Sequence, residues 1–275
     1  MEGTLEPSAS APDDAPGPPG VPADLLAAGG VRCAVEGAVA TVTLARPERR
    51  NAQTPETWQA LAAIGRALPG TVRVVVLRGE GPSFSAGLDL SRLTPEFIGT
   101  LARQDDAALD ATLESYQEAF TWWRRPDLVS IASVAGHAVG AGFQLALACD
   151  LRVVADDVRF AMRETSLGLV PDLGGTKPLV DCVGYARALE ICATGRWIDA
   201  KEAQQLGLAT LVVPLAELAA ATQDLVAAVL ATPRDAVVEL KALLQGAGGR
   251  SYDEQRSAER AAQIRRLRDL AGLGE

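Results

Sequence analysis

The sequence predicts an α/β protein whose core is a largely parallel β-sheet covered by helices. Short runs of β-branched apolar residues alternate with helical patterns, and two glycine-rich stretches each connect such a run to a helix-like segment. The chain has 275 residues, of which 48% are hydrophobic, and that is enough for one substantial core. Connections between parallel strands are expected to be right-handed, with ligands at the carboxyl ends of the strands, where both glycine-rich stretches lie.

Three regions are expected along the chain. Residues 1–28 hold six of the sixteen prolines together with small and acidic residues. Such a composition cannot bury enough apolar surface to offset its ordering entropy, so a disordered leader is predicted. Residues 29–205 are expected to form the α/β core, and residues 206–275 a C-terminal helical region.

The first half of the core is predicted from alternating strand and helix signals. Thr54 is suited to cap a helix, with Pro55 at its first position. The apolar run at 72–77 is nearly continuous, which is typical of a strand buried on both faces. The expected elements are strands at 31–35 and 39–44, a polar loop at 46–51, a helix at 55–68 and a strand at 72–77.

The second half is predicted to become increasingly helical. Asp199 is suited to cap the helix expected at 199–207, and Gly207 is suited to end it. The last three helices carry apolar stripes with nothing obvious to enclose, so they are expected to pack on another subunit. The expected elements are a helix at 106–123, strands at 128–134 and 151–154, a short helix at 143–149, and helices at 185–194, 199–207, 215–230, 233–244 and 252–270.

The two glycine-rich stretches are the main functional signal. They are Phe84-Ser-Ala-Gly-Leu-Asp89 and Ala135-Gly-His-Ala-Val-Gly-Ala-Gly142. A strand followed by such a turn and a helix start leaves main-chain N–H groups without internal partners, and two facing turns can hold one oxygen that carries developing negative charge. Because Gly140-Ala-Gly142 lacks the third glycine of a dinucleotide fingerprint, nucleotide-phosphate binding is the weaker interpretation.

Composition excludes several classes of partner. The net charge of −9 and the absence of a basic stripe argue against nucleic acid. Four widely spaced cysteines and a single histidine, His137, argue against a metal site and indicate reduced thiols in a cytoplasmic protein. Neither a signal peptide nor a membrane span is predicted.

Five segments follow one another along the chain: Arg46-Pro-x-x-x-Asn51-Ala52, Phe84 to Asp89, Ala135 to Gly142, Ala148-Cys-Asp150 and Gly168-Leu-Val-Pro-Asp-Leu-Gly-Gly-Thr176. Together they resemble the crotonase, or enoyl-CoA hydratase/isomerase, superfamily over roughly residues 30–250. The resemblance implies the crotonase (ClpP-like) fold of repeated ββα units, with a C-terminal helical region for trimerisation. It also implies homotrimers or dimers of trimers, and acyl-CoA substrates in which coenzyme A is part of the substrate, so that no separate cofactor is expected.

The resemblance also assigns roles to individual positions. The two thioester-binding amides correspond to Leu88 and Ala141, and Gly140 belongs to the second turn. Arg46 is also open to interpretation as an ordinary surface charge. The positions that match the family's adenine and pantetheine surroundings are Arg46, Ala52, Ala86 and Asp89.

The acid–base residues differ from those of the family's hydratases. Those enzymes have two glutamates, and this chain has Gln144 and Glu164 at the matching positions. An amide does not titrate near neutral pH, so Gln144 is expected to shape the pocket without taking a proton. Asp172 lies where isomerases of the family carry a working aspartate, and two carboxylates at an apolar slot raise each other's pKa. The structural alternatives are ion pairing of Glu164 with Arg163 or Arg159, and helix capping by Asp172.

The sequence therefore favours an enzyme that shifts a double bond in a 3-enoyl- or dienoyl-CoA through an enolate. A hydratase that uses Glu164, a non-catalytic acyl-CoA-binding protein and a scaffold remain as alternatives. His137 is interpreted as a packed residue or pocket wall and Trp197 as a core residue. Lys241 is a candidate for a contact to coenzyme A.

Overall fold

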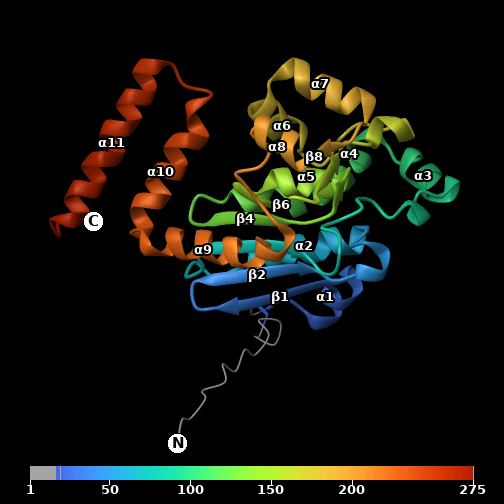
Figure 1. Cartoon of the computed structure of the whole chain (residues 1–275), viewed down its shortest axis with the longest axis horizontal. Helices are drawn as coiled ribbons and strands as arrows, with labels where there is room; N and C mark the ends of the chain where they lie inside the picture. The colour runs from blue at the N-terminus through green and yellow to red at the C-terminus, as the bar shows by residue number, and fades with distance from the viewer. Residues whose placement is uncertain (1–16, 19, 275) are drawn as a thin grey trace, which may run out of the picture.

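The computed structural model describes residues 17, 18 and 20–274 (Figure 1). A six-stranded sheet has the order β1-β2-β3-β4-β6-β9, and all neighbours pair in parallel except β1 with β2. A second sheet has the order β5-β7-β8. The predicted largely parallel sheet is confirmed. The strands are β1 (Val31–Glu36), β2 (Val39–Leu44), β3 (Val74–Gly79), β4 (Val129–Val134), β5 (His137–Val139), β6 (Leu151–Ala155), β7 (Arg159–Ala161), β8 (Ile198–Asp199) and β9 (Leu211–Val213).

Helices cover both faces of the larger sheet. Val75 and Leu77 of β3 face the main core, while Val74 and Val76 face a second cluster that includes Val226 of α9. Burial on both sides explains the continuous apolar runs in these strands. The α-helices are α1 (Ala23–Gly29), α2 (Pro55–Ala67), α3 (Pro95–Ala102), α4 (Asp106–Thr121), α5 (Ala141–Ala148), α6 (Thr176–Val183), α7 (Tyr185–Thr194), α8 (Ala200–Gln205), α9 (Leu218–Ala231), α10 (Arg234–Ala247) and α11 (Tyr252–Leu270). Single-turn 3₁₀ helices are η1 (Pro47–Arg49), η2 (Leu90–Arg92), η3 (Trp122–Arg124), η4 (Glu164–Leu167) and η5 (Leu215–Glu217).

Helix α1 corrects the predicted extent of the leader. It lies at Ala23–Gly29, inside the segment that was expected to be disordered. A Cβ at Gly29 would lie 2.7 Å from the Glu56 carbonyl oxygen, so glycine allows α1 to approach α2 closely. The Thr57 hydroxyl also donates to the Gly29 carbonyl. Packing therefore orders a segment whose composition alone favours disorder. The leader's other residues, apart from 17, 18 and 20–22, lie outside the described residues.

The helix signals at α2 and α8 are confirmed. The Thr54 hydroxyl accepts from the Thr57 amide, and the Thr57 hydroxyl accepts from the Thr54 amide. A threonine thus completes a capping box in which glutamate is the usual partner. Asp199 caps α8 by accepting from the Glu202 amide.

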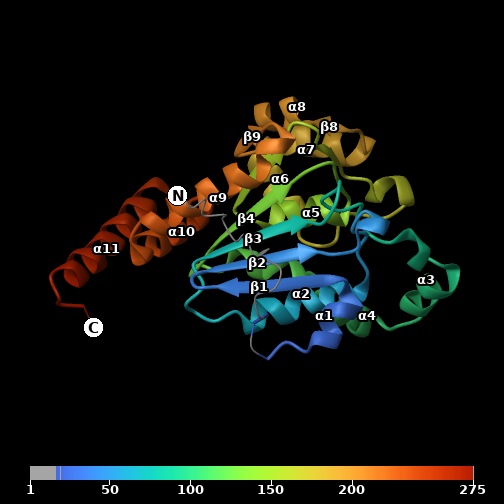
Figure 2. The same cartoon turned by 60° about the horizontal axis from the view of Figure 1, so that its bottom comes forward.

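The C-terminal region differs from the prediction in two respects. Strand β9 pairs with β6, so the sheet extends beyond the expected boundary at residue 205. Helix α9 packs against the sheet of its own chain through Val226, although its apolar stripe was expected to face another subunit. Helices α10 and α11 form a hairpin that projects from one end of the molecule (Figures 1 and 2).

No single helix in the described part of the chain combines the length and the apolar character needed to cross a membrane. The segments Leu215–Ala231 and Arg234–Ala247 reach those limits only when they are taken together, and a 104° bend separates them.

Candidate functional site

The two glycine-rich turns lie side by side at the carboxyl ends of β3 and β4. Ser85 pairs with β5 as if it belonged to the smaller sheet: its amide donates to the His137 carbonyl at 2.8 Å, and its carbonyl accepts from the Val139 amide at 3.0 Å. The two segments, about fifty residues apart in the sequence, are therefore joined directly by main-chain hydrogen bonds.

Glycine makes this approach possible. Gly87 has φ +85°, and a Cβ there would lie 2.3 Å from the Val139 carbonyl oxygen. Any larger residue would push the turns apart, both sterically and through its backbone conformation. The same Cβ position is only 3.4 Å from the Ala141 nitrogen. Gly87, the residue before Leu88, therefore lies close to the amide of Ala141.

The Leu88 and Ala141 amides have no acceptor among the residues that the structure describes. The Gln53 carbonyl accepts from the Asp89 amide, and the Gln53 amide donates to the Gly87 carbonyl. These two partners are the residues directly before and after Leu88. Because neighbouring residues of an extended strand point to opposite sides, the Leu88 N–H points away from Gln53. Ala141 is the first residue of α5, where an N–H has no intrahelical partner. Two such donors in adjoining turns can stabilise one oxyanion.

A buried polar network supports the first turn from behind. The Ser85 hydroxyl donates to the Asn51 carbonyl and accepts from the Gln53 side-chain amide and from the Gly87 amide. The Trp58 indole N–H donates to the Gln53 side-chain oxygen at 2.8 Å. Sequence reasoning did not single out Gln53 or Ser85. The only available signal was that both polar residues lie within or next to the recognised motifs.

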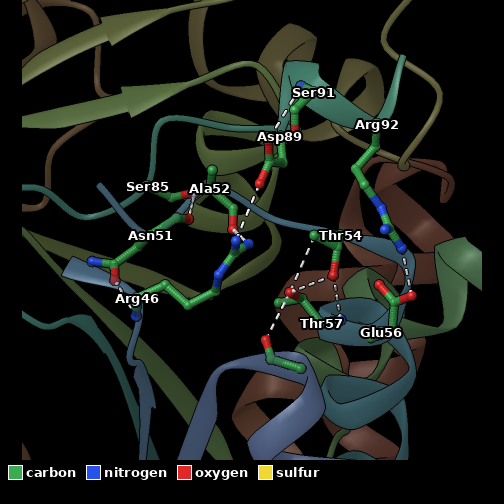
Figure 3. A network of polar contacts seen from close by, with 11 residues as sticks. Arg46, Asn51, Ala52, Thr54, Glu56, Thr57, Ser85, Asp89, Ser91 and Arg92 are labelled. Carbon is green, nitrogen blue, oxygen red and sulfur yellow. Dashed lines mark hydrogen bonds and ion pairs between the residues drawn. The ribbon is translucent and has the colours of Figure 1, made fainter. Parts of the chain in front are cut away.

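Three of the predicted coenzyme A positions, Arg46, Ala52 and Asp89, lie together at the same turn (Figure 3). The Arg46 guanidinium donates to the Ala52 carbonyl at 2.8 Å and to the Asp89 carboxylate at 3.1 Å. Arg46 is thus not an isolated surface charge. Ser91, and then Arg46, lower the pKa of Asp89 by hydrogen bonds to its carboxylate. The amide of Ala86 donates to the main chain of the same Arg46–Asn51 loop.

Glu164 opens η4 beside the second turn and is 9% exposed. A Cβ at Gly140 would lie 3.3 Å from Glu164 Oε1, so the carboxylate lies directly against the turn. Oε2 is buried and has no hydrogen-bond partner among the residues that the structure describes. Burial, and to a smaller extent the charge of Asp172, raises the pKa of Glu164.

The structural alternative for Glu164 is wrong. No ion pair in the described part of the chain involves this carboxylate, and the Arg163 guanidinium instead lies 4.7 Å from the centre of the Trp197 ring. Trp197 is 44% exposed and is therefore not the core residue that the sequence indicated. His137 packs edge-to-face on the same ring, in agreement with its interpretation as a packed residue.

Gln144 connects the two acidic segments. Its side-chain oxygen accepts from the amides of Leu173 and Gly175 at 3.0 and 3.2 Å. Its Nε2 donates to Glu164 Oε1 at 2.6 Å, and the residue is 1% exposed. Gln144 was expected only to shape the pocket, whereas in the structure it also joins the segments that carry Glu164 and Asp172.

Asp172 lies on the exposed rim of the same site. Desolvation by the surrounding protein raises the pKa of its carboxyl, and its exposure to solvent limits that effect. The capping alternative is wrong, because α6 begins after Gly175 without any side-chain cap. The Gln117 side chain donates to the Asp172 carbonyl at 2.6 Å. The charge of Asp172 also raises the pKa of Glu164, so the two carboxyl groups interact electrostatically.

Two further expectations concern residues outside this cluster. Lys241 is no candidate for a contact to coenzyme A, because it is 8% exposed and its ammonium donates to Asp150 and to the carbonyls of Arg125 and Leu128. This ion pair attaches α10 to Asp150, which directly precedes β6 and accepts from the Ser130 amide near the start of β4. All four cysteines are free, and the described residues contain no group of three or more potential metal ligands.

The family model for enoyl-CoA hydratase/isomerase matches residues 34–268. The chain belongs to this family. The family's crotonase fold, with two sheets and C-terminal helices, is the fold described above.

Solved structures and curated relatives agree with this assignment. A provisionally assigned enoyl-CoA hydratase of Thermobifida fusca YX, in complex with CoA, is 51% identical with a TM-score of 0.86 and covers 92% of this chain and 98% of its own. Its complex with acetoacetyl-CoA gives 50% identity, a TM-score of 0.86 and coverage of 90% and 99%. The mitochondrial Delta(3,5)-Delta(2,4)-dienoyl-CoA isomerase of Dictyostelium discoideum is 30% identical over 64% of this chain and 62% of its own length.

Proposed function

We propose that this protein shifts a double bond in an acyl-CoA through a thioester enolate. Family membership supports an acyl-CoA enzyme, and the relative from Thermobifida fusca that was solved with CoA and acetoacetyl-CoA supports a coenzyme A thioester as the ligand. A second relative is a dienoyl-CoA isomerase. The substrate class is thus a 3-enoyl- or dienoyl-CoA.

One observation carries the choice of isomerisation. Gln144 occupies a position next to Glu164 where the family's hydratases resemble one another in having a second glutamate, and its amide cannot accept a proton. The proton-transferring groups that remain at the site are Glu164 and Asp172. Both have a raised pKa, which suits groups that exchange a proton near neutral pH.

The proposed steps balance without a further reagent. The Leu88 and Ala141 amides donate to the thioester oxygen. One carboxylate takes the proton from the α-carbon, and the C–H electron pair becomes the enolate that the two amides stabilise. The other carboxyl, in its acid form, delivers a proton further along the chain, and the double bond moves. Removing one such oxyanion donor reduces turnover by roughly 10²–10³-fold.

Two other parts of the assignment follow from the same likeness. Arg46, Ala52, Ala86 and Asp89 are proposed to surround the adenine and pantetheine of coenzyme A. The α10–α11 hairpin is proposed to pack on a second copy of the chain in a trimer or dimer of trimers, since Leu244 and Leu267 are 65% and 56% exposed. A cytoplasmic location stays a prediction.

Incubation of the purified protein with 3-enoyl-, 3,5-dienoyl- and 2-enoyl-CoA tests the proposal. Bond migration without net addition of water is the expected result. Glu164→Gln and Asp172→Asn are each expected to remove most of the turnover. Full activity in both variants would refute the proposed mechanism.

Hydration is the second candidate, because Glu164 lies beside Gly140 as a working base would and the Thermobifida fusca relative is assigned as a hydratase. A hydroxyacyl-CoA product would favour it. Saturable binding of all three thioesters without turnover would indicate a non-catalytic binding protein.

A further inference from the structure

The amide of Gln144 can adopt only one orientation. Its Oε1 accepts from two main-chain N–H groups, those of Leu173 and Gly175. An amide nitrogen in that place would face two donors with a donor, so the oxygen must lie there. The nitrogen is then turned toward Glu164, where it donates to Oε1 at 2.6 Å.

This orientation makes the two oxygens of Glu164 unequal. Oε1 is engaged by Gln144, whereas Oε2 is buried and has no partner in the described part of the chain. An unpaired buried carboxylate oxygen lowers stability, so its presence calls for a functional reason. Proton transfer is such a reason, because the oxygen that takes the proton must have a free lone pair.

We propose that Gln144 is a positioning residue that reserves Oε2 of Glu164 as the single oxygen for proton transfer. The same amide ties η4, which carries Glu164, to the loop that carries Asp172, and so sets how the two acids lie relative to each other. This inference rests on the proposed function, in which these two acids exchange the substrate proton.

The hydrogen bond also has a definite electrostatic sign. A donor to a carboxylate stabilises the charged form, so Gln144 lowers the pKa of Glu164 against the larger, opposing effect of burial. Without this donor the pKa of Glu164 would rise further. The other ionisable groups near Glu164 are Asp172 before α6, Cys192 on α7 and the neighbouring Arg163, while α5 itself carries none.

Gln117 provides a matched control. Its side-chain nitrogen donates to the Asp172 carbonyl, so Gln117 holds the same loop from α4. No contact joins it to Glu164 among the hydrogen bonds of the described residues. Replacing either glutamine by methionine keeps a similar side-chain volume. Gln117→Met removes one hydrogen bond to the loop, and Gln144→Met removes two. Only Gln144→Met also removes the donor to Glu164.

The test is deuterium exchange at the α-carbon of butanoyl-CoA in heavy water, measured against pH. This probe has no double bond to move, so the result does not depend on which product the enzyme makes. Gln144→Met is expected to lower the maximal exchange rate about tenfold and to move the acid limb of the profile upward by about one pH unit, with the Michaelis constant little changed. Gln117→Met is expected to leave the acid limb in place.

Gln144→Glu keeps the shape of the side chain and makes the donor depend on protonation. Its carboxyl group can still accept from Leu173 and Gly175, but only its protonated form can donate to Glu164. Two carboxylates at hydrogen-bond distance share a proton. While the pair holds that proton the donor to Glu164 is kept, so the acid limb is expected to move upward less than in Gln144→Met.

An unchanged acid limb in Gln144→Met would overturn the inference, as would equal effects of Gln144→Met and Gln117→Met. If the wild-type protein exchanges no deuterium, the proposed function itself fails. In that case an infrared titration of the Glu164 carboxyl band tests the inference. The band is identified by its loss in Glu164→Gln. The midpoint of that band must rise in Gln144→Met and not in Gln117→Met.

Discussion

One half of the candidate site consists of main-chain groups and the other half of side chains. The half around Leu88 and Ala141 presents main-chain N–H groups held by strand-like pairing between the turns and by a buried network behind them. The half around Glu164 and Asp172 presents side chains on a 3₁₀ turn and on the loop that follows it. The comparison teaches that the first half depends on where the backbone runs, whereas the second depends on which residue occupies each position.

The largest effect is expected where the backbone half cannot tolerate a side chain. Gly87→Ala places a Cβ where only 2.3 Å separates it from the Val139 carbonyl oxygen, in a left-handed conformation. The turns must move apart, and the two amides no longer converge. We expect kcat/KM to fall by roughly 10²–10³-fold in steady-state assays.

Gly37→Ala is the matched control, because Gly37 has φ +58° with nothing within 4 Å of an added Cβ. It is expected to cost about 1 kcal/mol of stability and to leave turnover unchanged. Near-normal turnover in Gly87→Ala would show that the close approach of the turns is not needed.

A smaller effect is expected from the side chain that supports the backbone half. Ser85→Ala leaves the Gln53 side-chain amide and the Gly87 amide without an acceptor in a buried site. We expect a loss of about 1–3 kcal/mol in urea unfolding and a roughly tenfold fall in kcat. Ser115→Ala, at an exposed position whose hydroxyl donates to a carbonyl of its own helix, should change stability by less than about 0.5 kcal/mol. A Ser85→Ala protein that loses stability but keeps its full kcat would separate the network from the oxyanion turn.

The smallest effect concerns the stability cost of the side-chain half. The pKa of Glu164 is higher in the folded protein than in the unfolded chain, chiefly because of burial. Its contribution to stability is therefore complete below the ordinary glutamate pKa and is lost as pH rises through the folded value. At pH values above the folded pKa, Glu164→Gln should be more stable than the wild type by on the order of 1 kcal/mol. Urea unfolding at several pH values between 4 and 8 measures this difference.

Glu190→Gln should behave in the opposite sense. Hydrogen bonds from Arg196 lower the pKa of Glu190, so this variant should lose stability at neutral pH and approach the wild type as pH falls. If Glu164→Gln instead lost stability at pH 8, the carboxylate would be contributing favourably to the fold, and the contrast between the two halves would be weaker.

The elements of the backbone half were predictable from the sequence to a large degree. Periodicity located the buried strands, and the glycine-rich turns after those strands indicated unpaired main-chain amides, which the family resemblance assigned to Leu88 and Ala141. The cap at Thr54 was equally local. These features depend on a few neighbouring residues, and glycine's conformational freedom is a property of the residue itself.

Short or packing-dependent elements were not predictable in the same way. Strand β9 has three residues and is recognisable only through its pairing with β6. Helix α1 follows a proline-rich segment and is held by contacts to α2. Lys241 had the charge expected of a contact to coenzyme A, and only its burial against Asp150 shows that it anchors α10.

Residue types and their local spacing were sufficient to predict the strand pattern and the glycine-rich turns, and the family resemblance added the candidate acids. Which polar atoms meet is a property of the folded chain. Gln144 finds its partners twenty, twenty-nine and thirty-one residues further along, and within the described part of the chain Oε2 of Glu164 has no partner. Hydrogen bonds act over a few ångströms in space without regard to separation along the chain, so no local pattern contains them.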